Sequence, residues 1–338
     1  MSALDALAAA GGARCLMLAD EASGLRAFIA IDSLALGPAA GGIRTMPYGE
    51  EKKAIGDAVR LAAAMTLKCA VAGLDAGGGK TVVIDHPGMK RGAAFEQLGR
   101  FIQELRGLYY AAGDVGTTED DLAAAARFTA YVHRGGPVLA EAAGQGVLRC
   151  MEACAQERGR DGVAGLRVAI QGCGAMGAGV ARALHAAGAR LVLADTDGAR
   201  VTSLARELSA EIAPVEAILH ADVDIVAPCA LGGVITLESV RMLRAWAICG
   251  AANNQLANDD VGNRLAEREV FYVPDFLASA GAVISGMSAS PADAAQRIDG
   301  LRETARTVLQ HAAAARRLTA EVARAIAYAR INAAGGQS

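Results

Sequence analysis

The sequence has no excess of charge of one sign and no long hydrophobic run. Its 33 basic and 36 acidic residues give a net charge of −3, which provides no positive field for a phosphate backbone, so we expect no nucleic-acid partner. No stretch reaches about 18 apolar residues without a polar break, and residues 1–10 contain no basic segment of the kind that begins a secretion signal. These absences predict a soluble, cytoplasmic protein with no membrane partner.

The cysteines and histidines lack the spacing of a disulfide framework or a metal site. The 7 cysteines are an odd number and mostly lie in apolar segments, which is typical of reduced thiols in a protein core. Cys150 and Cys154 lie one helical turn apart, but none of the 5 histidines lies near them at ligand spacing. We therefore expect small core residues rather than zinc ligands, and no bound metal.

The length of the chain indicates two domains. With 338 residues, of which 53% are hydrophobic, the chain can form two separate cores. We expect an α/β fold with an N-terminal substrate and oligomerisation domain over residues 1–137 and a Rossmann-like, doubly wound dinucleotide-binding domain over 138–288. Helices over 289–338 would pack back toward the substrate domain, and the substrate would bind in the cleft between the two domains.

Both halves of the chain alternate strand and helix patterns. In the first half we predict strands over 13–18, 25–31, 81–84 and 108–111, and helices over 50–65, 92–105 and 118–126. In the second half we predict strands over 167–171, 190–194, 225–227, 246–249 and 270–273, with helices over 146–157, 175–187 and beyond Pro291. The repeated strand–helix units of the second half predict a parallel sheet.

A glycine-rich segment in the second half has the context of a dinucleotide loop. Gly172, Gly174 and Gly177 follow a predicted strand and open a predicted helix, whose first amide groups can bind a pyrophosphate. Asp195 ends the next strand, where a carboxylate accepts ribose hydroxyls and repels a 2′-phosphate. The segment therefore predicts binding of NAD rather than NADP. The alternative is a glycine-rich turn that binds nothing.

Two lysines in the first half flank a second glycine cluster. Lys68 ends a predicted helical segment over 54–67, and Lys80 follows Gly77–Gly79. We expect these glycines to form a tight turn with positive φ that faces a ligand, because residues without Cβ let the backbone approach closely. The lysines would then offer positive charge to a small anion. Taken alone, each lysine could also be a solvated surface charge.

Several motifs together resemble the catalytic domain of the Glu/Leu/Phe/Val amino-acid dehydrogenases, which include enzymes for leucine, valine and phenylalanine. The resembling segments of the first half are Gly37–Arg44, Met65–Lys68, Gly77–Lys80 and Gly113–Thr117. Those of the second half, which are similar to the family's cofactor and substrate loops, are Ala227–Gly232 and Gly250–Leu256. The resemblance extends over residues 10–290.

The resemblance implies a reaction and three residues that carry it. Lys68 would bind the substrate carboxylate, Lys80 would act as a general base with a lowered pKa, and Asp114 would relay protons to and from the amine. Oxidative deamination requires hydride transfer from Cα to nicotinamide, attack of water on an iminium, and release of ammonia. Two lysines in one dry cleft would lower each other's pKa. Considered alone, Asp114 could equally cap a helix.

The resemblance also implies the remaining contacts of the site. The other substrate-binding residues would be Gly41, Met65, Ala40, Ala112, Asn254, Val283 and Gly286. The cofactor-binding residues would be Gly172, Gly174, Ala175, Met176, Gly177, Asp195, Thr196, Cys229, Ala230, Ala251 and Asn253. The two asparagines could also simply form a turn. The partners would be an amino acid or its 2-oxo acid, ammonia, and further copies of the chain in a dimer or larger homo-oligomer.

The chain departs from the family pattern at three places. The usual Thr-Ala-x-Gly segment is Ala143–Gly146, the usual Asn-Ala-Gly-Gly segment is Ser279–Ala282, and the acid that commonly precedes the catalytic aspartate is Gly113. These changes concern placement of the nicotinamide and the turnover rate. The changes in the Ala143–Gly146 and Ser279–Ala282 segments favour an alternative in which the protein binds NADH without turnover.

The implied side-chain pocket is lined by small residues. Leucine-specific relatives tend to carry larger residues where this chain has Ala40 and Gly286. A roomier apolar pocket favours a bulky substrate, because each buried CH₂ contributes about 0.8 kcal/mol. We therefore expect phenylalanine or a similar amino acid, with leucine or valine as the second choice. An unusual amino acid or an imine of a specialised pathway is a further alternative.

Overall fold

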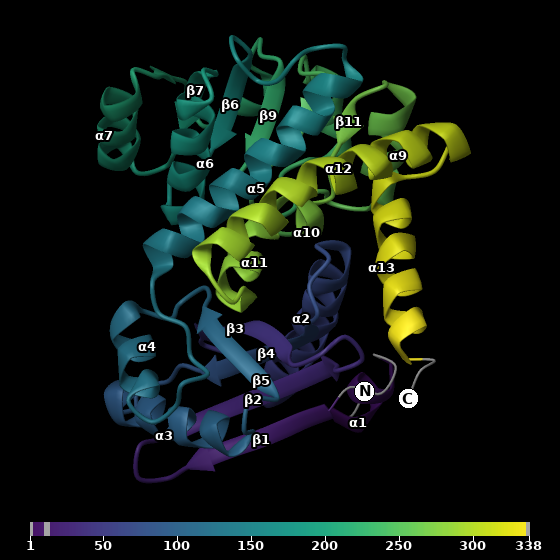
Figure 1. Cartoon of the computed structure of the whole chain (residues 1–338). Coiled ribbons are helices and arrows are strands. Elements are labelled where there is room, and N and C mark those ends of the chain that lie inside the picture. Colours follow the sequence, from purple (N-terminus) through teal and green to yellow (C-terminus); the bar gives the residue numbers. More distant parts are fainter. Residues whose placement is uncertain (1–2, 10–13, 336–338) are drawn as a thin grey trace. The chain divides into compact units, whose positions relative to one another are not determined.

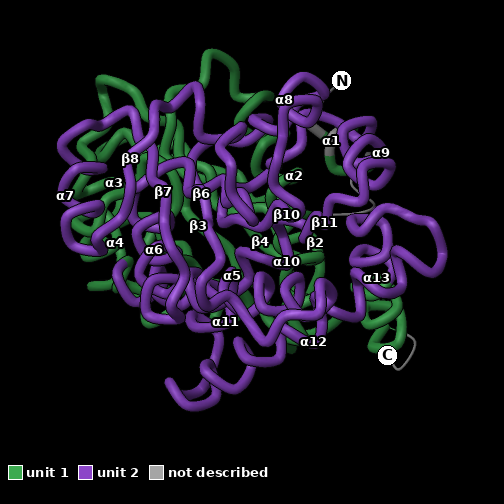
Figure 2. Tube along the Cα trace, turned by 90° about the horizontal axis from the view of Figure 1, so that it is seen from above, with its two compact units in different colours: residues 1–136, 326–338 green, residues 137–325 purple. Residues whose placement is uncertain are grey.

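The structure is a computed structural model that describes residues 3–9 and 14–335. It divides the chain into two compact units (Figures 1 and 2): unit 1 holds residues 1–136 and 326–338, and unit 2 holds residues 137–325. Unit 2 is thus inserted into the sequence of unit 1. Within residues 3–9 and 14–335, no helix has both the length and the apolar character needed to cross a membrane.

Unit 1 is built on a five-stranded mixed sheet. Its helices are α1 (Ala3–Ala9), α2 (Glu51–Val71), α3 (Arg91–Glu104) and α4 (Glu119–Ala126). Its strands are β1 (Arg14–Asp20), β2 (Leu25–Ser33), β3 (Ala39–Met46), β4 (Gly77–Ile84) and β5 (Tyr109–Gly113). The strand order is β1-β2-β4-β3-β5, with β3 parallel to both β4 and β5, and β2 antiparallel to its two neighbours.

The two faces of this sheet have separate cores. On one face, Phe95 and Leu98 of α3 and Leu122 of α4 pack with the inward residues of the strands. On the other face, α2 packs against strand residues that include Phe28 and Val82. Lys80 lies on this side of the sheet, because it is two residues from Val82 along β4.

The prediction for Gly77–Gly79 was wrong. These glycines are not a tight turn but the first, buried residues of β4, and none of the three, all within the described chain, has a positive φ. Their role is close packing: a Cβ at Gly77 would lie 1.8 Å from the carbonyl oxygen of Ser33, and a Cβ at Gly78 would lie 2.1 Å from the backbone nitrogen of Thr66. The missing side chains let α2 and β2 approach the strand that carries the second lysine.

Unit 2 contains a six-stranded parallel sheet. Its strands are β6 (Arg167–Gln171), β7 (Arg190–Ala194), β8 (Glu211–Ile212), β9 (Ile225–Pro228), β10 (Ala247–Ile248) and β11 (Phe271–Tyr272), in the order β11-β10-β9-β6-β7-β8. If β6 is numbered as strand 1 and the sheet is followed from β8 to β11, the order is 3-2-1-4-5-6, which is that of a dinucleotide-binding fold. The predicted Rossmann-like, doubly wound domain is therefore confirmed.

The helices of unit 2 begin with α5 (Gly136–Glu157), which starts ten residues before the predicted helix over 146–157. The others are α6 (Ala175–Ala186), α7 (Gly198–Leu208), the short 3₁₀ helix η1 (Ile218–His220), α8 (Leu237–Met242), α9 (Asp259–Glu267), α10 (Asp275–Ala278), α11 (Gly281–Met287), α12 (Pro291–Ala315) and α13 (Thr319–Gly335). The last helix passes from unit 2 back into unit 1.

Glycines set the spacing between α5 and its neighbours. A Cβ at Gly144 of α5 would lie 2.3 Å from the carbonyl oxygen of Gly179 in α6, and a Cβ at Gly281 would lie 2.0 Å from the carbonyl oxygen of Ala142. Gly144, which stands where the family pattern has alanine, therefore lies at a close helix contact and has a packing role in this chain. Gly281, which matches a glycine of the family pattern, lies at a second close contact.

Candidate active site

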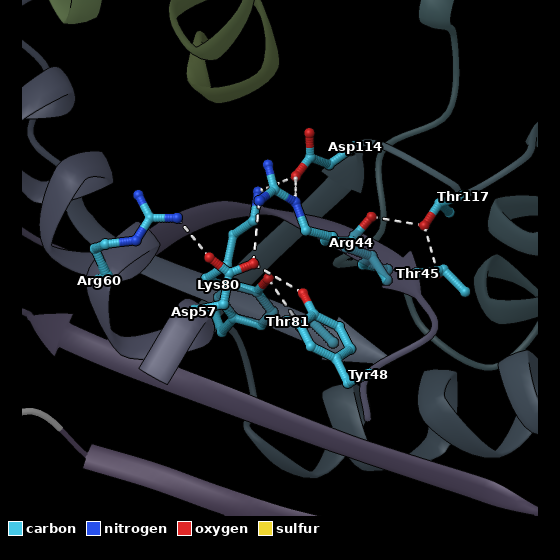
Figure 3. A network of polar contacts seen from close by, with 11 residues as sticks. Arg44, Thr45, Tyr48, Asp57, Arg60, Lys80, Thr81, Asp114 and Thr117 are labelled. Carbon is cyan, nitrogen blue, oxygen red and sulfur yellow. Dashed lines mark hydrogen bonds and ion pairs between the residues drawn. The ribbon is translucent and has the colours of Figure 1, made fainter. Parts of the chain in front are cut away.

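Lys80 and Asp114 form a buried ion pair on the α2 side of the unit 1 sheet (Figure 3). Lys80 lies in β4 and is 6% exposed, and its Nζ is 2.6 Å from Oδ2 of Asp114, the residue that follows β5. The strand between them, β3, has Gly42 at this level. A Cβ there would lie 2.9 Å from both Nζ of Lys80 and Cβ of Asp114. The glycine is therefore needed for the pair to form.

Arg44 is a third member of the site and was not among the predicted site residues. It lies two residues after Gly42 on the same face of β3, and its Nε donates to the Asp114 oxygen that Lys80 contacts, at 3.0 Å. Its Nη1 donates to Asp57 of α2 at 3.1 Å. The alternation of side chains along a strand could have indicated that this arginine shares a face with the predicted lysine.

The charges of these groups shift their protonation equilibria. Burial lowers the pKa of Lys80, the charge of Asp114 opposes this effect, and the charge of Arg44 adds to the lowering, so that the pKa lies below its usual value. Burial alone would raise the pKa of Asp114, but the charges of Lys80 and Arg44 outweigh it and lower the pKa. A neighbouring cation that lowers the pKa of Lys80 was predicted from the sequence for Lys68, and Arg44 is a cation that has this effect in the structure.

The turn that carries Asp114 is tied to β3. Gly116 has φ 77°, and a Cβ there would lie 1.8 Å from the carbonyl oxygen of Thr45. Thr117 donates its hydroxyl to the carbonyl oxygen of Ile43 at 2.6 Å, and the hydroxyls of Thr45 and Thr117 are 2.8 Å apart (Figure 3). These contacts fix the level of Asp114 along the sheet. The helix cap after this turn belongs to Thr118, not to Asp114.

The other predicted lysine, Lys68, lies in α2, which continues three residues further to Val71. Thr66 of this helix packs against Gly78 of β4. Its hydroxyl donates to Asp32 of β2 at 2.5 Å. Asp32 lies where the pairing of β2 with β4 shifts by one residue, and burial raises its pKa although the hydrogen bond from Thr66 opposes this. Sequence reasoning did not identify this half-buried carboxyl group.

The predicted substrate residues divide between the units. In unit 1, Met65 lies in α2, Ala40 and Gly41 lie in β3, and Gly42 pairs with Ala112 of β5. A Cβ at Gly41 would lie 1.8 Å from the carbonyl oxygen of Gly79, so Gly41 serves close strand packing as well. In unit 2, the predicted substrate residues occupy one helix and one loop: Val283 and Gly286 in α11, and Asn254 after β10.

The glycine loop of unit 2 has the geometry of a dinucleotide site. Gly172 has φ 95°, and a Cβ at Gly177 would lie 1.9 Å from its carbonyl oxygen, so both glycines are required by the turn itself. At Gly174, by contrast, a Cβ would meet no heavy atom of the described residues within 4 Å. The middle glycine of the motif thus leaves the backbone open to a ligand at the start of α6, where Ala175 and Met176 follow.

The other predicted cofactor residues lie beyond the carboxyl ends of neighbouring strands. Cys229 and Ala230 follow β9, and a Cβ at Gly172 would lie 2.7 Å from that of Ala230. Ala251 and Asn253 follow β10, and Thr196 follows β7. Because the order of the strands reverses between β6 and β9, these loops border the switch point at which such folds bind nucleotides.

Asp195 is held by the backbone of its own domain. Its Oδ2 accepts from the Cys173 amide at 2.6 Å, and its Oδ1 accepts from the Asp197 amide at 2.8 Å and lies 3.4 Å from Nη1 of Arg200. Burial would raise the pKa of Asp195, but the two amides and Arg200 lower it, so the group is a carboxylate at neutral pH. It fixes the glycine loop and carries the negative charge expected at the ribose end of the site.

A dinucleotide-binding fold in one unit and a buried lysine–carboxylate pair in the other define the class as an α/β dehydrogenase. Comparison with known proteins shows the family. The chain belongs to the Glu/Leu/Phe/Val dehydrogenases: the family's dimerisation domain matches residues 13–131, and its Glutamate/Leucine/Phenylalanine/Valine dehydrogenase domain matches residues 135–202 and 193–327.

Several named relatives belong to the same family. The chain is 41% identical to the leucine dehydrogenase of Thermoactinomyces intermedius over 80% of this chain and 76% of that one. It is 38% identical to the phenylalanine dehydrogenase of Bacillus thermotolerans over 78% and 73% of the two chains. The crystal structure of L-tryptophan dehydrogenase from Nostoc punctiforme superposes with a TM-score of 0.84 at 32% identity, covering 98% of this chain and 99% of that one.

Proposed function

We propose that this protein catalyses the NAD-dependent, reversible oxidative deamination of an apolar L-amino acid to its 2-oxo acid and ammonia. The observation that carries the proposal is the buried pair of Lys80 and Asp114, because a lysine with a lowered pKa beside a carboxylate suits proton transfer near neutral pH. The names of the relatives support the substrate class, since they act on leucine, phenylalanine and tryptophan.

In this proposal each residue has one task. Lys68 binds the substrate carboxylate, and Lys80 in its neutral form removes the proton of the water molecule that attacks the iminium carbon. Asp114 accepts and returns protons as the amine leaves as ammonia. When bound, NAD⁺ accepts the hydride from Cα, and water supplies the oxygen of the 2-oxo acid.

The cofactor assignment is supported by Asp195, whose ionised carboxylate at the end of β7 disfavours a 2′-phosphate. Gly172, Gly174, Ala175, Met176, Gly177, Thr196, Cys229, Ala230, Ala251 and Asn253 would hold the dinucleotide. We further propose that the protein is a cytoplasmic homo-oligomer, which the match to a dimerisation domain supports.

We propose an aromatic or similarly bulky side chain for the substrate, with leucine or valine as the second candidate. Ala40 of β3 and Ala112 of β5 are small apolar residues, and the family resemblance also assigns Val283 and Gly286 of α11 to the substrate side chain. The 41% identity to leucine dehydrogenases favours the second candidate. Asn254, Gly41 and Met65 would complete the substrate contacts.

The test is a measurement of NADH formation at 340 nm with each of the twenty amino acids in turn. We expect the highest kcat/KM with phenylalanine or another apolar L-amino acid, and the reverse reaction with the 2-oxo acid, NADH and ammonium.

Ala40→Leu should raise the ratio of kcat/KM for leucine to kcat/KM for phenylalanine by roughly 10- to 200-fold, because it fills space that a phenyl ring needs. Absence of turnover in both directions, with NADH still bound, would refute the proposal and indicate a protein that only binds the nucleotide.

A further inference from the structure

Arg44 joins two carboxylates that come from different elements of unit 1. Its Nε donates to Oδ2 of Asp114 at 3.0 Å, and its Nη1 donates to Oδ2 of Asp57 at 3.1 Å (Figure 3). The arginine side chain is 17% exposed, and the two carboxylates are 19% and 18% exposed. A guanidinium group can make both contacts because its donors point in fixed, different directions, which a lysine ammonium cannot reproduce.

Asp57 is itself held in place. The hydroxyl of Tyr48 donates to its Oδ2 at 2.8 Å, and Arg60 contacts its other oxygen (Figure 3). Burial would raise the pKa of Asp57, but the hydrogen bonds from Tyr48 and Arg60 and the charge of Arg44 lower it. The anchor on α2 is therefore an ionised, fixed carboxylate at neutral pH.

The proposed chemistry creates a need for such an anchor. Lys80 must lose its proton to act as a base, and at that moment its attraction for Asp114 falls from that of an ion pair to that of a neutral hydrogen bond. Arginine remains protonated throughout. Since Arg44 contacts the same oxygen of Asp114 as Lys80 does, it can keep the carboxylate in position while the lysine is neutral.

We propose that Arg44, anchored by Asp57, is a positioning residue that holds the carboxylate of Asp114 against Nζ of Lys80 through the proton-transfer cycle. This inference rests on the proposed function of the Lys80–Asp114 pair. It separates two roles of the arginine, its charge and its bridging geometry, and the geometry can be removed without the charge.

Three variants distinguish the two roles. Arg44→Gln removes the charge and the bridge, so we expect kcat to fall by roughly 100-fold. The acidic limb of the plot of kcat/KM against pH, where activity is lost as Lys80 gains a proton, should move to higher pH. The reason is that the charge of Arg44 contributes to the low pKa of Lys80. Arg44→Lys keeps the charge but not both contacts, so kcat should fall while the limb stays near that of the wild type. Asp57→Asn should lower kcat and move the limb to lower pH, because the charge of Asp57 raises the pKa of Lys80.

The matched control is Arg149→Gln in unit 2. Arg149 also bridges two carboxylates through Nε and Nη1, at 2.7 Å to Asp299 and 2.9 Å to Glu152, and its side chain is 24% exposed. Its loss removes a similar pair of contacts from residues of unit 2 that have no proposed catalytic role. We expect the midpoint of the acidic limb to remain that of the wild type.

A second measurement does not depend on turnover. The chain contains few lysines, so ¹³Cε-lysine labelling gives a simple NMR titration in which Lys80→Gln identifies the signal; the lysines are Lys52, Lys53, Lys68, Lys80 and Lys90. The Lys80 signal should titrate at higher pH in Arg44→Gln and at lower pH in Asp57→Asn than in the wild type.

If Arg44→Gln keeps both the wild-type kcat and the wild-type titration, the inference is wrong. If the wild type turns over no amino acid, the proposed function fails, and the titrations still decide whether Arg44 acts on Lys80.

Discussion

At the scale of single residues, the site depends on how far each ionisable group is removed from water. Lys80 is almost fully buried, and the charged groups that act on it come from β3, from the turn after β5 and from α2. A buried lysine of this kind has a lowered pKa because water no longer stabilises its charge. The same burial that makes Lys80 a useful base would be costly without Asp114, which compensates its charge before the proton leaves.

The two predicted lysines should therefore respond differently to substitution. Lys80→Ala should abolish measurable turnover and leave NADH binding nearly unchanged, because the base acts on the substrate. Lys68→Ala should raise KM strongly, since it removes a contact with the carboxylate that is present in both ground and transition states. Steady-state kinetics with an NADH fluorescence titration measure both effects; normal kinetics in both variants would show that the lysines have no role in the chemistry.

Asp195 offers a test of the cofactor assignment. Asp195→Asn keeps an oxygen that can accept from the Cys173 amide at 2.6 Å but removes the negative charge. We expect weaker NAD binding and a smaller preference for NAD over NADP, because a 2′-phosphate would no longer meet a like charge and Arg200 would be free to pair with it. The ratio of kcat/KM for the two cofactors measures the change. Asp197→Asn, which changes a more exposed carboxylate on the same arginine, should alter the ratio less; a wild type that prefers NADP would contradict the assignment.

At the scale of elements, glycines determine how closely helices and strands of this chain pack. Gly281 begins α11 at a point where a Cβ would lie 2.0 Å from the carbonyl oxygen of Ala142. Gly281→Ala should destabilise unit 2 by about 1 to 3 kcal/mol, because either α5 or α11 must move.

The control is Gly300, which lies exposed within α12 with no heavy atom of the described chain within 4 Å of its Cβ position. Gly300→Ala should instead stabilise by about 0.5 to 1 kcal/mol. Thermal unfolding followed by circular dichroism compares the two; equal effects would show that the close contact at Gly281 is not limiting.

The elements also show what could be predicted from sequence and what could not. Most of the strands and the dinucleotide loop depend on local patterns, and they were predicted; β3, which carries Arg44, was not among the predicted strands. Gly77–Gly79 could not be assigned correctly, because a glycine needed for contact with Thr66 of α2 looks the same in sequence as a glycine needed for a turn. The role of Arg44 was missed for a similar reason: its partners lie 13 and 70 residues away, and only the register of β3 brings it to them.

At the scale of the whole molecule, unit 1 is completed by residues from the end of the described chain. Arg330 of α13 donates to the carbonyl oxygen of Leu74 at 2.5 Å and pairs with Asp75 at 2.6 Å, just beyond the end of α2. Arg330→Ala should lower the stability of unit 1 by about 1 to 3 kcal/mol, because hydrogen bonds from a charged group are lost. It should also raise KM moderately, since α2 carries Lys68.

The control is Arg324→Ala, at an exposed position on the same helix. Thermal unfolding and steady-state kinetics of the two variants should be compared; identical behaviour would contradict the role of Arg330.

The insertion of unit 2 into unit 1 imposes an order on biosynthesis. Residues 137–325 leave the ribosome as one continuous segment, so unit 2 can fold as soon as its last strand and helices have emerged. Unit 1 must wait, because the part of α13 that belongs to it is translated after unit 2. Unit 1 therefore begins to emerge before unit 2 but is completed after it, and until then the α2 segment that holds Lys68 lacks its contacts with Arg330.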